Sequence, residues 1–495
     1  MKIITMRHIL GNKVLQYDVD ARGVIVDERE YDRTVNPIIL ADWVKEHMVF
    51  WYDMSKPVDV YTQNFNDWYN YNPNSVSITN NKIVVNGLID NFRIASIGKE
   101  TESFSVFIEG LGDKNLIYRV KLDENSDQIT NIKLKDGENV LPHSFATTVA
   151  FMGVSGVTDY IGLTITQLPS GQSVPTNEIL KANPYLQDFS GNNRPLKLNN
   201  FLFAAMSGVG GYDISRTNIL PDRANVTVTD NRIIHITKKL STTDNMVNIV
   251  PANSNPTHKF KVTGLSDGRQ VSLVNRNGGF YTFDNGEHEV TLTYPEGTTS
   301  LYNSIGVTGD IGDMDVTIEF LPKYPNALIT DGADDYGVVE NFKSLQNYMM
   351  FFQCAITRPN AVNGMFSTTP IENGNNISGW MLLQGNYVNS VRFGNNGYKN
   401  FNVTSSIGDK ISYVLSANNE LMTCYVGEEK ATQAGTYRQT GANMSLFLSD
   451  ARGKTRFGSI AFYKSILFDS VPTKETDGFT EQDLINYVLE NLITK

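Results

Sequence analysis

Cysteine is nearly absent from this chain of 495 residues, which contains only Cys354 and Cys424. So few thiols in so long a chain indicate a protein that does not depend on disulfides. The two residues could face each other on neighbouring strands, but buried free thiols are the more common arrangement, and we expect them here. This cysteine usage is typical of a protein made and folded in a reducing cytoplasm.

Charged residues are also few, at 19% of the chain, and the formal net charge is −11. Nucleic acids and anionic membranes require a basic face, so we expect no nucleic acid and no membrane as partner. No apolar run approaches the roughly 20 residues of a membrane helix. The opening stretch MKIITMRHILGNKVLQYD lacks the apolar core and small-residue cleavage site of a signal peptide, so we expect no export by that route.

Residues that carry catalysis are scattered along the chain. The six histidines stand singly, and none is spaced from another His, Cys or carboxylate as a zinc site requires. No nucleophile elbow, phosphate-binding loop or dinucleotide-binding glycine pattern stands between a strand and a helix. The sequence therefore predicts that the protein is not an enzyme and needs no cofactor, with calcium as the one ion to consider below.

Aromatic residues are abundant, with 23 Tyr and 25 Phe residues, and short alternating runs separated by Gly, Asn, Asp or Pro fill most of the chain. Helical spacing is confined to residues 36–47, where Asn36 would cap and Pro37 would begin the helix, and to the stretch that Thr480 would cap. A short helical turn is expected after Thr176. The pattern predicts an all-β chain with a small N-terminal helix-containing segment.

Two stretches about 150 residues apart resemble each other. The matching phrases keep their order, and their spacing drifts by only a few residues: SVSITNNKIVV and NVTVTDNRIIH, Gly110-Leu111 and Gly264-Leu265, Gly137-Glu138 and Gly286-Glu287, GVSG and GVTG, TITQLP and TIEFLP. We interpret residues 57–170 and 225–323 as two copies of one β-sandwich module with seven or so strands, joined by a connector over 171–224.

Residues 324–495 continue as eight or more alternating strands, which predicts a jelly roll of two larger stacked sheets. NALITDGADDYGVV from Asn326, FGSIAFYKSILFDS from Phe457 and the terminal helix resemble the opening strand, closing strand and last helix of concanavalin A-like, laminin-G-like jelly rolls. Upstream, YLQDFSGNNRPLKLNNF from Tyr185 resembles the lead-in of such domains, although Asn193 stands where the lead-in usually has Gly. The resemblance implies that the second sandwich is inserted between lead-in and jelly-roll body.

The stretch WYDMSKP echoes this lead-in, with Asp53 and Ser55 in the places of Asp188 and Ser190, so lead-in and sandwich are expected to be duplicated together. Together with NNFLFAAMSGVGGYD, these phrases resemble virion proteins of tailed phages and prophages of gut Bacteroidales. The resemblance implies a fibre or decoration protein of the head or tail, assembled in the host cytoplasm and located in the virion.

Residues 1–56 differ from the modules in their higher charge. They are expected either to attach the chain to other virion proteins or simply to cap the first sandwich. Self-association as a trimer is expected from how fibres are built. The aromatic and polar stretch NDWYNYNPN, residues 66–74, is expected to be a subunit contact or a packed linker.

The acidic turn near residue 331 has two interpretations. Asp331, Asp334 and Asp335 could hold calcium, since clustered carboxylates and loop carbonyls suit a hard cation, and in the resembling family calcium often lies beside the glycan site. The alternative is that Asp and Gly residues form a tight turn that binds nothing.

A stretch rich in loops, GWMLLQGNYVNSVRFGNNGYKN, holds candidate sugar-binding residues. Aromatic rings stack on the apolar faces of pyranoses, and amide and charged groups reach their hydroxyls. The candidates are Trp380, Tyr387, Arg392, Asn395, Asn396 and Tyr398. The alternative is that Trp380 and Arg392 belong to the core and framework.

Glycoside hydrolases of the jelly-roll family commonly carry E-x-D-x-x-E on one strand, where alternation places the acids on one face. The nearest string here, ETDGFTE with Glu475, Asp477 and Glu481, is one residue too long and leads into a helix. It predicts a solvated turn and a favourable acidic first helical turn. The expected function is therefore attachment of a virion to host surface glycan. The alternatives are a bacterial cell-surface glycan-binding protein and, further away, a glycoside hydrolase.

Overall fold

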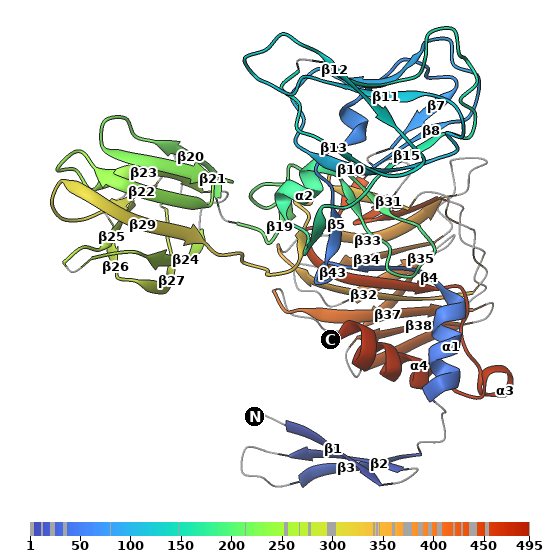
Figure 1. Ribbon diagram of the computed structural model, residues 1–495. Coiled ribbons are helices and arrows are strands. Elements are labelled where there is room, and N and C mark those ends of the chain that lie inside the picture. Colours follow the sequence, from blue (N-terminus) through green and yellow to red (C-terminus); the bar gives the residue numbers. More distant parts are fainter. Residues whose placement is uncertain are drawn as a thin grey trace. The chain divides into compact units, whose positions relative to one another are not determined.

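The computed structural model is nearly all β, with helices confined to four short stretches among the residues it describes (Figure 1). The chain is described from residue 4 to 494 outside these gaps: 11–12, 20–24, 33–36, 80, 147, 213, 252–255, 267, 276–278, 295–302, 340–341, 343–344, 346, 359–361, 370–378, 385–389, 395–397, 403–407, 419–420, 427–428, 435–442 and 451–454. No helix within that part is long and apolar enough to cross a membrane.

The chain divides into two compact units. One consists of Met1–Asp53, Leu186–Phe201 and Leu328–Lys495, and the other of Met54–Tyr185 and Leu202–Ala327. The first unit contains the jelly roll and the second contains both sandwiches, and each is described by itself.

Two large antiparallel sheets form the jelly roll. The first has the order β17 (Tyr185–Leu186), β18 (Leu196–Asn199), β31 (Tyr336–Val339), β40 (Asn443–Leu446), β33 (Val362–Thr369), β34 (Gly379–Gln384), β35 (Ser390–Gly394) and β36 (Tyr398–Asn402). The second runs from β30 (Leu328–Ile329) through β43 (Ile460–Phe468), β32 (Tyr348–Ile356), β37 (Ile411–Ala417) and β38 (Leu421–Val426) to β39 (Glu429–Ala434), with β4 (Met48–Asp53) also beside β43. A hairpin of β41 (Leu448–Asp450) and β42 (Thr455–Phe457) follows β40.

Both faces of the second sheet are covered, and every residue of β32 and β43 is buried. Phe352 and Phe462 pack with Phe447 on the side of the first sheet, with ring centroids 5.1–6.4 Å apart. On the other side lie α1 (Pro37–His47) and α4 (Glu481–Val488), whose Trp43 and Leu484 belong to one core cluster with strand residues (Figure 1). This double burial explains why these strands are largely apolar, interrupted in β32 by Gln353 and in β43 by Lys464 and Ser465.

The helix predictions are confirmed at the described residues. Pro37 begins α1, and Thr480 forms a capping box with Asp483 at the start of α4. Thr176 caps α2 (Asn177–Ala182) through the N–H of Ile179. Asn36 lies outside the described residues. The remaining helical turns are α3 (Lys474–Asp477), η1 (Phe65–Asp67) and η2 (Leu489–Ile493).

The boundary predicted at residue 56 lies close to the division of the chain after Asp53, but α1 and β4 belong to the jelly roll and not to a separate N-terminal segment. Strand β4 pairs with β43 in the register of Asp53 to Lys464 and completes that edge of the sheet. The carboxylate of Asp53 and the ammonium of Lys464 lie 3.1 Å apart and are 1% and 5% exposed. Ahead of α1, the chain forms a three-stranded antiparallel sheet that we did not predict: β1 (Ile4–Leu10), β2 (Lys13–Val19) and β3 (Ile25–Asp32).

The lead-in forms a turn that rests on β4. The Asp188 carboxylate accepts hydrogen bonds from the backbone N–H groups of Trp51 and Ser190, each at 2.9 Å, and of Arg194 at 3.0 Å. Asn193 has a φ of 52°, which explains why a glycine suits this place. The predicted duplication of the lead-in stays a prediction: Asp53 ends β4, a turn follows over residues 54–55, and the Asp53 carboxylate pairs with Lys464.

The jelly roll is interrupted twice. The first sandwich follows β4 and ends before the lead-in, and the second lies between β18 and β30. Since β18 pairs with β31 in the register of Lys197 to Val338, the expected insertion of the second sandwich within the jelly roll is confirmed. The insertion of the first sandwich was not predicted.

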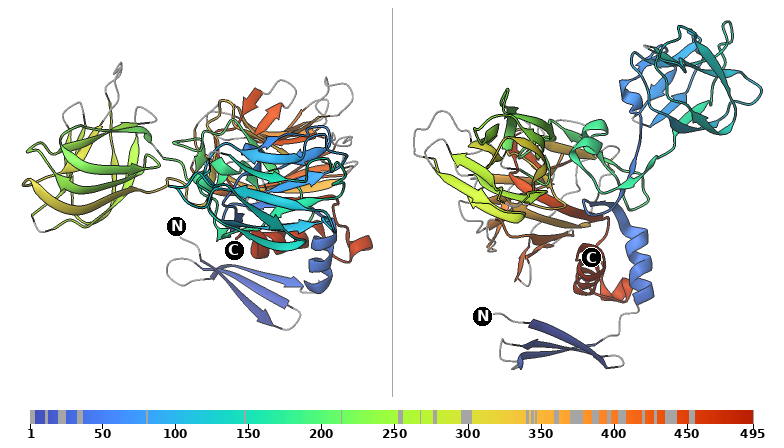
Figure 2. Two further views of the ribbon diagram at one scale, coloured as in Figure 1. Left: turned by 45° about the horizontal axis from the view of Figure 1, so that its top comes forward. Right: turned by 60° about the vertical axis from the view of Figure 1, so that its left-hand side comes forward.

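Each sandwich has two five-stranded sheets, which Figure 2 shows as stacked layers. The first consists of β6 (Tyr69–Asn70), β7 (Val76–Ile78), β8 (Lys82–Val85), β9 (Arg93–Ile97), β10 (Phe104–Glu109), β11 (Leu116–Val120), β12 (Thr130–Leu134), β13 (Gly137–Leu141), β14 (Val149–Met152) and β15 (Thr164–Gln167). The second consists of β20 (Ile214–Ile219), β21 (Ala224–Thr229), β22 (Ile233–Lys239), β23 (Asn245–Pro251), β24 (Thr257–Thr263), β25 (Val271–Asn275), β26 (Phe280–Phe283), β27 (Gly286–Thr291), β28 (Asn303–Val307) and β29 (Gly312–Phe320). Short strands β5 (Val58–Val60), β16 (Gly171–Ser173) and β19 (Gly208–Val209) lie outside the two sandwiches.

The two sandwiches have one topology. The sheets of the first are β13-β10-β15-β8-β7 and β12-β11-β14-β9-β6, and those of the second are β27-β24-β29-β22-β21 and β26-β25-β28-β23-β20. When the ten strands of each copy are numbered in chain order, the two sheets of both copies have the strand orders 8-5-10-3-2 and 7-6-9-4-1. The duplication is therefore confirmed. Each copy has ten strands instead of the seven or so expected, because short strands such as β6 and the non-alternating β9 give no clear pattern.

The residues that the copies share make equivalent contacts. Gly110 and Gly264 have φ values of 77° and 86°, and each lies where a Cβ would come within 2.3 Å of a backbone carbonyl oxygen of the facing segment. The next residue in each copy donates its backbone N–H to the side chain that precedes the Gly-Glu pair. Leu111 donates to Asp136 at 2.9 Å, and Leu265 donates to Asn285 at 3.0 Å. The repeated phrases therefore mark backbone positions that both copies need.

The cysteines are buried and free, as expected. Cys354 lies on β32 and Cys424 on β38, with β37 between them. Burial raises the pKa of the Cys424 thiol to about 12 and that of Cys354 further, so neither thiolate forms at neutral pH.

We predict that Gly110→Ala and Gly264→Ala each destabilise the protein by about 1–2 kcal/mol or more, because alanine is strained at positive φ and would collide with the facing carbonyl. Urea unfolding measures the effect. Gly171→Ala is the matched control, since a Cβ there meets nothing within 4 Å. Unchanged stability in both tested variants would contradict the equivalence.

Candidate functional site

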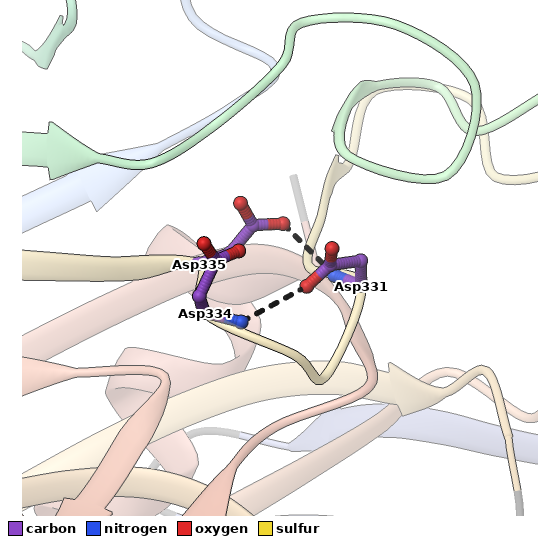
Figure 3. Close-up of side chains that lie close together, drawn as sticks. All are labelled: Asp331, Asp334 and Asp335. Carbon is purple, nitrogen blue, oxygen red and sulfur yellow. Dashed lines mark hydrogen bonds between the residues drawn. The ribbon is translucent and has the colours of Figure 1, made fainter. Parts of the chain in front are cut away.

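The acidic turn between β30 and β31 brings all three predicted residues together (Figure 3). One carboxylate oxygen from each of Asp331, Asp334 and Asp335 lies within 4.8 Å of the others. Asp335 accepts the N–H of Asp331 at 2.9 Å, and Asp331 accepts those of Ala333 and Asp334 at 2.7 and 3.4 Å. The side-chain amide of Asn200 donates to the carbonyl of Asp334 at 3.0 Å.

This geometry serves the turn and also gathers oxygen atoms. Asp335 is fully buried, whereas Asp334 is exposed, and Gly332 supplies a φ of 77°. An oxygen-only donor set is what calcium requires, and the three carboxylates would supply both charge and ligands. Two of them are already bound to backbone N–H groups, which the tight turn alone requires. Calcium binding therefore stays a prediction.

Three of the candidate sugar-binding residues lie on adjacent strands of the first jelly-roll sheet. Trp380 on β34 pairs with Gly394 on β35, and Gly394 pairs with Tyr398 on β36. Arg392 stands two residues before Gly394 on β35. Because paired residues and alternate residues share a face of an antiparallel sheet, positions 380, 392 and 398 belong to one face. Tyr387, Asn395 and Asn396 lie outside the described residues.

The same face can be followed across the sheet by register. The row that contains Trp380 and Tyr398 consists of Lys197, Val338, Ser445, Ser367, Trp380, Gly394 and Tyr398. The neighbouring row, on the opposite face, consists of Leu198, Gly337, Leu446, Phe366, Met381, Phe393 and Lys399. Where burial is described, the second row holds the buried apolar residues Leu198, Leu446 and Phe366, and the first row holds the buried hydroxyl residues Ser367 and Ser445 beside the partly exposed Lys197 and Val338.

We call the face of the first row the polar face. Arg392 pairs with Asn400, which adds an amide to the aromatic and cationic positions there. Lys197 and Asn400 share this face and were not predicted as site residues, whereas Ser367 and Ser445 of the same row are buried. No local signal marks them, because only strand register shows that they share a face with Trp380.

The acidic string ETDGFTE lies in helices and turns. Glu475 and Asp477 belong to α3, and Glu481 begins α4. Burial by itself raises the pKa of Asp477. Hydrogen bonds from Thr476, the backbone of Thr473 and Trp43 together lower this pKa by more, so the net shift is downward. Trp43 Nε1 donates to this carboxylate at 3.0 Å. The acidic first turn of α4 was predicted, whereas helix α3 and the bond of Asp477 to Trp43 were not.

No family model and no curated protein matches the chain. Among solved structures, the carbohydrate-binding module CBM40 of the Ruminococcus gnavus IT-sialidase, bound to α2,3 sialyllactose, is 14% identical and has a TM-score of 0.23. The match covers 27% of this chain and 80% of that one. Domains LG4-5 of the mouse laminin α1 chain are 9% identical over 55% of this chain and 97% of theirs, with a TM-score of 0.24.

A prokaryotic β-1,3-1,4-glucanase derived from a mouse hindgut metagenome is 10% identical over 43% of this chain and 84% of its own, with a TM-score of 0.22. Likenesses at these TM-scores carry no functional argument. The jelly-roll assignment stands on the two stacked sheets and their strand order.

We predict that Asp335→Ala destabilises the protein by about 1–3 kcal/mol in the presence of a chelator, because it leaves the N–H of Asp331 without its acceptor. The exposed neighbour gives the matched control, and Asp334→Ala should change stability by no more than about 0.5 kcal/mol. Thermal unfolding measures both. Equal effects would contradict the structural role of Asp335. Repeating the melts with calcium tests the cation, since stabilisation that is lost in Asp334→Ala would indicate binding.

Proposed function

We propose that the jelly roll binds carbohydrate on its polar face, and that the chain is a structural protein of a virion that attaches to host surface glycan. Carbohydrate binding is supported by the register of β34, β35 and β36. This register assigns positions 380, 392 and 398 to the face opposite the apolar row. Sequence alternation alone left open whether Trp380 and Arg392 belong to the core.

The chemistry of this face suits a saccharide. Indole and phenol rings provide flat apolar surfaces for the C–H faces of pyranoses, and guanidinium and amide groups match ring hydroxyls. Arg392 and Asn400 pair directly across β35 and β36. A ligand that contacts Trp380 and Tyr398 can therefore reach both polar groups on one face.

We predict that Trp380→Ala weakens binding of host surface oligosaccharide about tenfold or more, because a stacked ring buries apolar surface worth roughly 2 kcal/mol. Titration calorimetry with purified host polysaccharide fragments measures the affinity. Phe280→Ala is the control, since Phe280 is an exposed aromatic residue of the second sandwich and should leave binding unchanged. If Trp380→Ala fails to fold, Arg392→Gln and Tyr398→Ala test the same face. Wild-type affinity in all folded variants would overturn this site.

The proposed role is binding without cleavage. The acidic string closest to a glycosidase motif is taken up by α3 and α4, where Asp477 binds Trp43 and Asp483 caps a helix. Host capsular polysaccharide should therefore keep its chain length on incubation with the protein, as size-exclusion chromatography would show. Shortened chains would favour a glycoside hydrolase instead.

The virion role rests on the tandem architecture and on the phrase-level resemblance. Two sandwiches of one topology, inserted into a jelly roll, suit spacers that present a binding domain. Attachment to other virion proteins would involve the β1–β3 sheet, and self-association as a trimer would place several binding faces together. Weak single contacts then gain from effective concentration.

We predict that antibodies against this protein label intact phage particles, in host cultures that release them, at regular positions on the head or tail. Immunogold electron microscopy measures this. The alternative, a bacterial cell-surface glycan-binding protein, shares the jelly-roll site but predicts label on uninfected cells. Label confined to cell surfaces, with none on purified particles, would replace the virion role by that alternative.

A further inference from the structure

A hollow with cationic walls lies on the outer face of the β12-β11-β14-β9-β6 sheet of the first sandwich. Its volume is about 460 Å³, and its lining includes Arg93, Arg119 and Lys121 together with the apolar residues Phe145 and Ala150. Tyr118 and Phe151, the paired neighbours of Arg119 and Ala150, are fully buried in the sandwich core. We call this site the basic hollow.

The charge of the basic hollow is not balanced from within. Three cations and one carboxylate, that of Asp127, line it, which gives 3 − 1 = +2 in a chain of net charge −11. None of the three cations forms an ion pair with a carboxylate of the residues that the structure describes. Like charges gathered without counter-charge repel each other, and an anion would relieve this repulsion.

Neutral contacts hold two of these cations in place. Arg93 lies over the ring of Tyr71, with its guanidinium carbon 5.7 Å from the ring centroid. Hydrogen bonds from Ser96 and then Arg93 lower the pKa of Tyr71, and the charge of Arg93 acts in the same direction. Lys121 donates to the carbonyl of Glu124 at 3.1 Å.

The second sandwich shows that the fold does not need a cation at the position of Arg119. In the first copy one row across the outer sheet consists of Asn131, Arg119, Ala150, Ser96 and Tyr69. The equivalent row of the second copy consists of Phe280, Val274, Ser304, Asn248 and Asn218. Val274 thus stands where Arg119 stands, and the ten-strand topology is the same. At this position the cation is present in the first copy and absent from the second.

We propose that the basic hollow binds the carboxylate-bearing unit of an acidic saccharide. A planar guanidinium binds a carboxylate through two parallel hydrogen bonds. The two arginines and the lysine of the basic hollow supply enough donors and charge to bind one carboxylate. Phe145, which is partly exposed, offers apolar surface to the C–H face of the ring, and the buried Ala150 and Met152 form the floor of the lining. A volume of this size lies within the range of small-ligand sites. The site is distinct from the polar face of the jelly roll and does not depend on it.

The test uses the full chain and titration calorimetry with three probes: trigalacturonic acid, the neutral trisaccharide of galactose, and inorganic phosphate. The acidic trisaccharide should bind, the neutral one should not, and phosphate should bind far more weakly. Arg119→Val, which installs the residue of the second copy, should weaken binding of the acid about tenfold or more, because it removes charged hydrogen bonds. The binding that Arg119→Val weakens and Lys82→Ala does not is the binding at the basic hollow, which separates it from any binding at the polar face.

Lys82→Ala is the matched control. Lys82 is exposed on β8 in the opposite sheet, so its removal changes the net charge equally and should leave the affinity unchanged. Equal weakening by Arg119→Val and Lys82→Ala, equal affinity for phosphate and acid, or no binding of the acid would each overturn the proposal. Circular dichroism checks folding, and Arg93→Gln tests the same hollow if Arg119→Val does not fold.

Discussion

The jelly roll depends on the pairing of β43 along both of its edges. Strand β32 lies on one side, while β30 and β4 share the other. The β4 edge is closed by the buried pair of Asp53 and Lys464, whose charges would be left uncompensated if either side chain were removed. A strand from near the start of the chain and one from near its end must therefore meet before the domain is complete.

This requirement explains how the sandwiches are arranged along the sequence. Each is an insertion between jelly-roll strands, and the chain returns to the same domain after each one. Insertions of this kind are tolerated at surface loops when the inserted module has a core of its own. Both sandwiches have one, and the described residues of each form a separate cluster of buried hydrophobic side chains.

Duplication has kept the scaffold and changed the surface. Both copies keep a glycine with positive φ, Gly110 or Gly264. Both also keep a side chain that accepts the N–H of the leucine after that glycine, because the backbone there needs both features. The outer row has diverged, with Arg119 in one copy and Val274 in the other. Function in this chain is therefore to be sought on sheet faces, where replacements leave the core intact.

Local features were predictable from the sequence, and long-range pairing was not. The capping of α4 by Thr480 and the start of α1 at Pro37 follow from neighbouring residues, as do the repeated glycine phrases. The partnership of Asp53 with Lys464 depends on segments at opposite ends of the chain. The candidate Trp380 could be named from its chemistry, but its face became clear only from the register of the strands around it.

The central claim is that the polar face of the jelly roll is a carbohydrate-binding surface. A crystal structure of the full chain with a bound oligosaccharide from the host surface tests this claim most directly. The account predicts sugar rings against Trp380 and Tyr398, with Arg392 or Asn400 on their hydroxyls. A saccharide held elsewhere on the jelly roll, with this face bare, would contradict it.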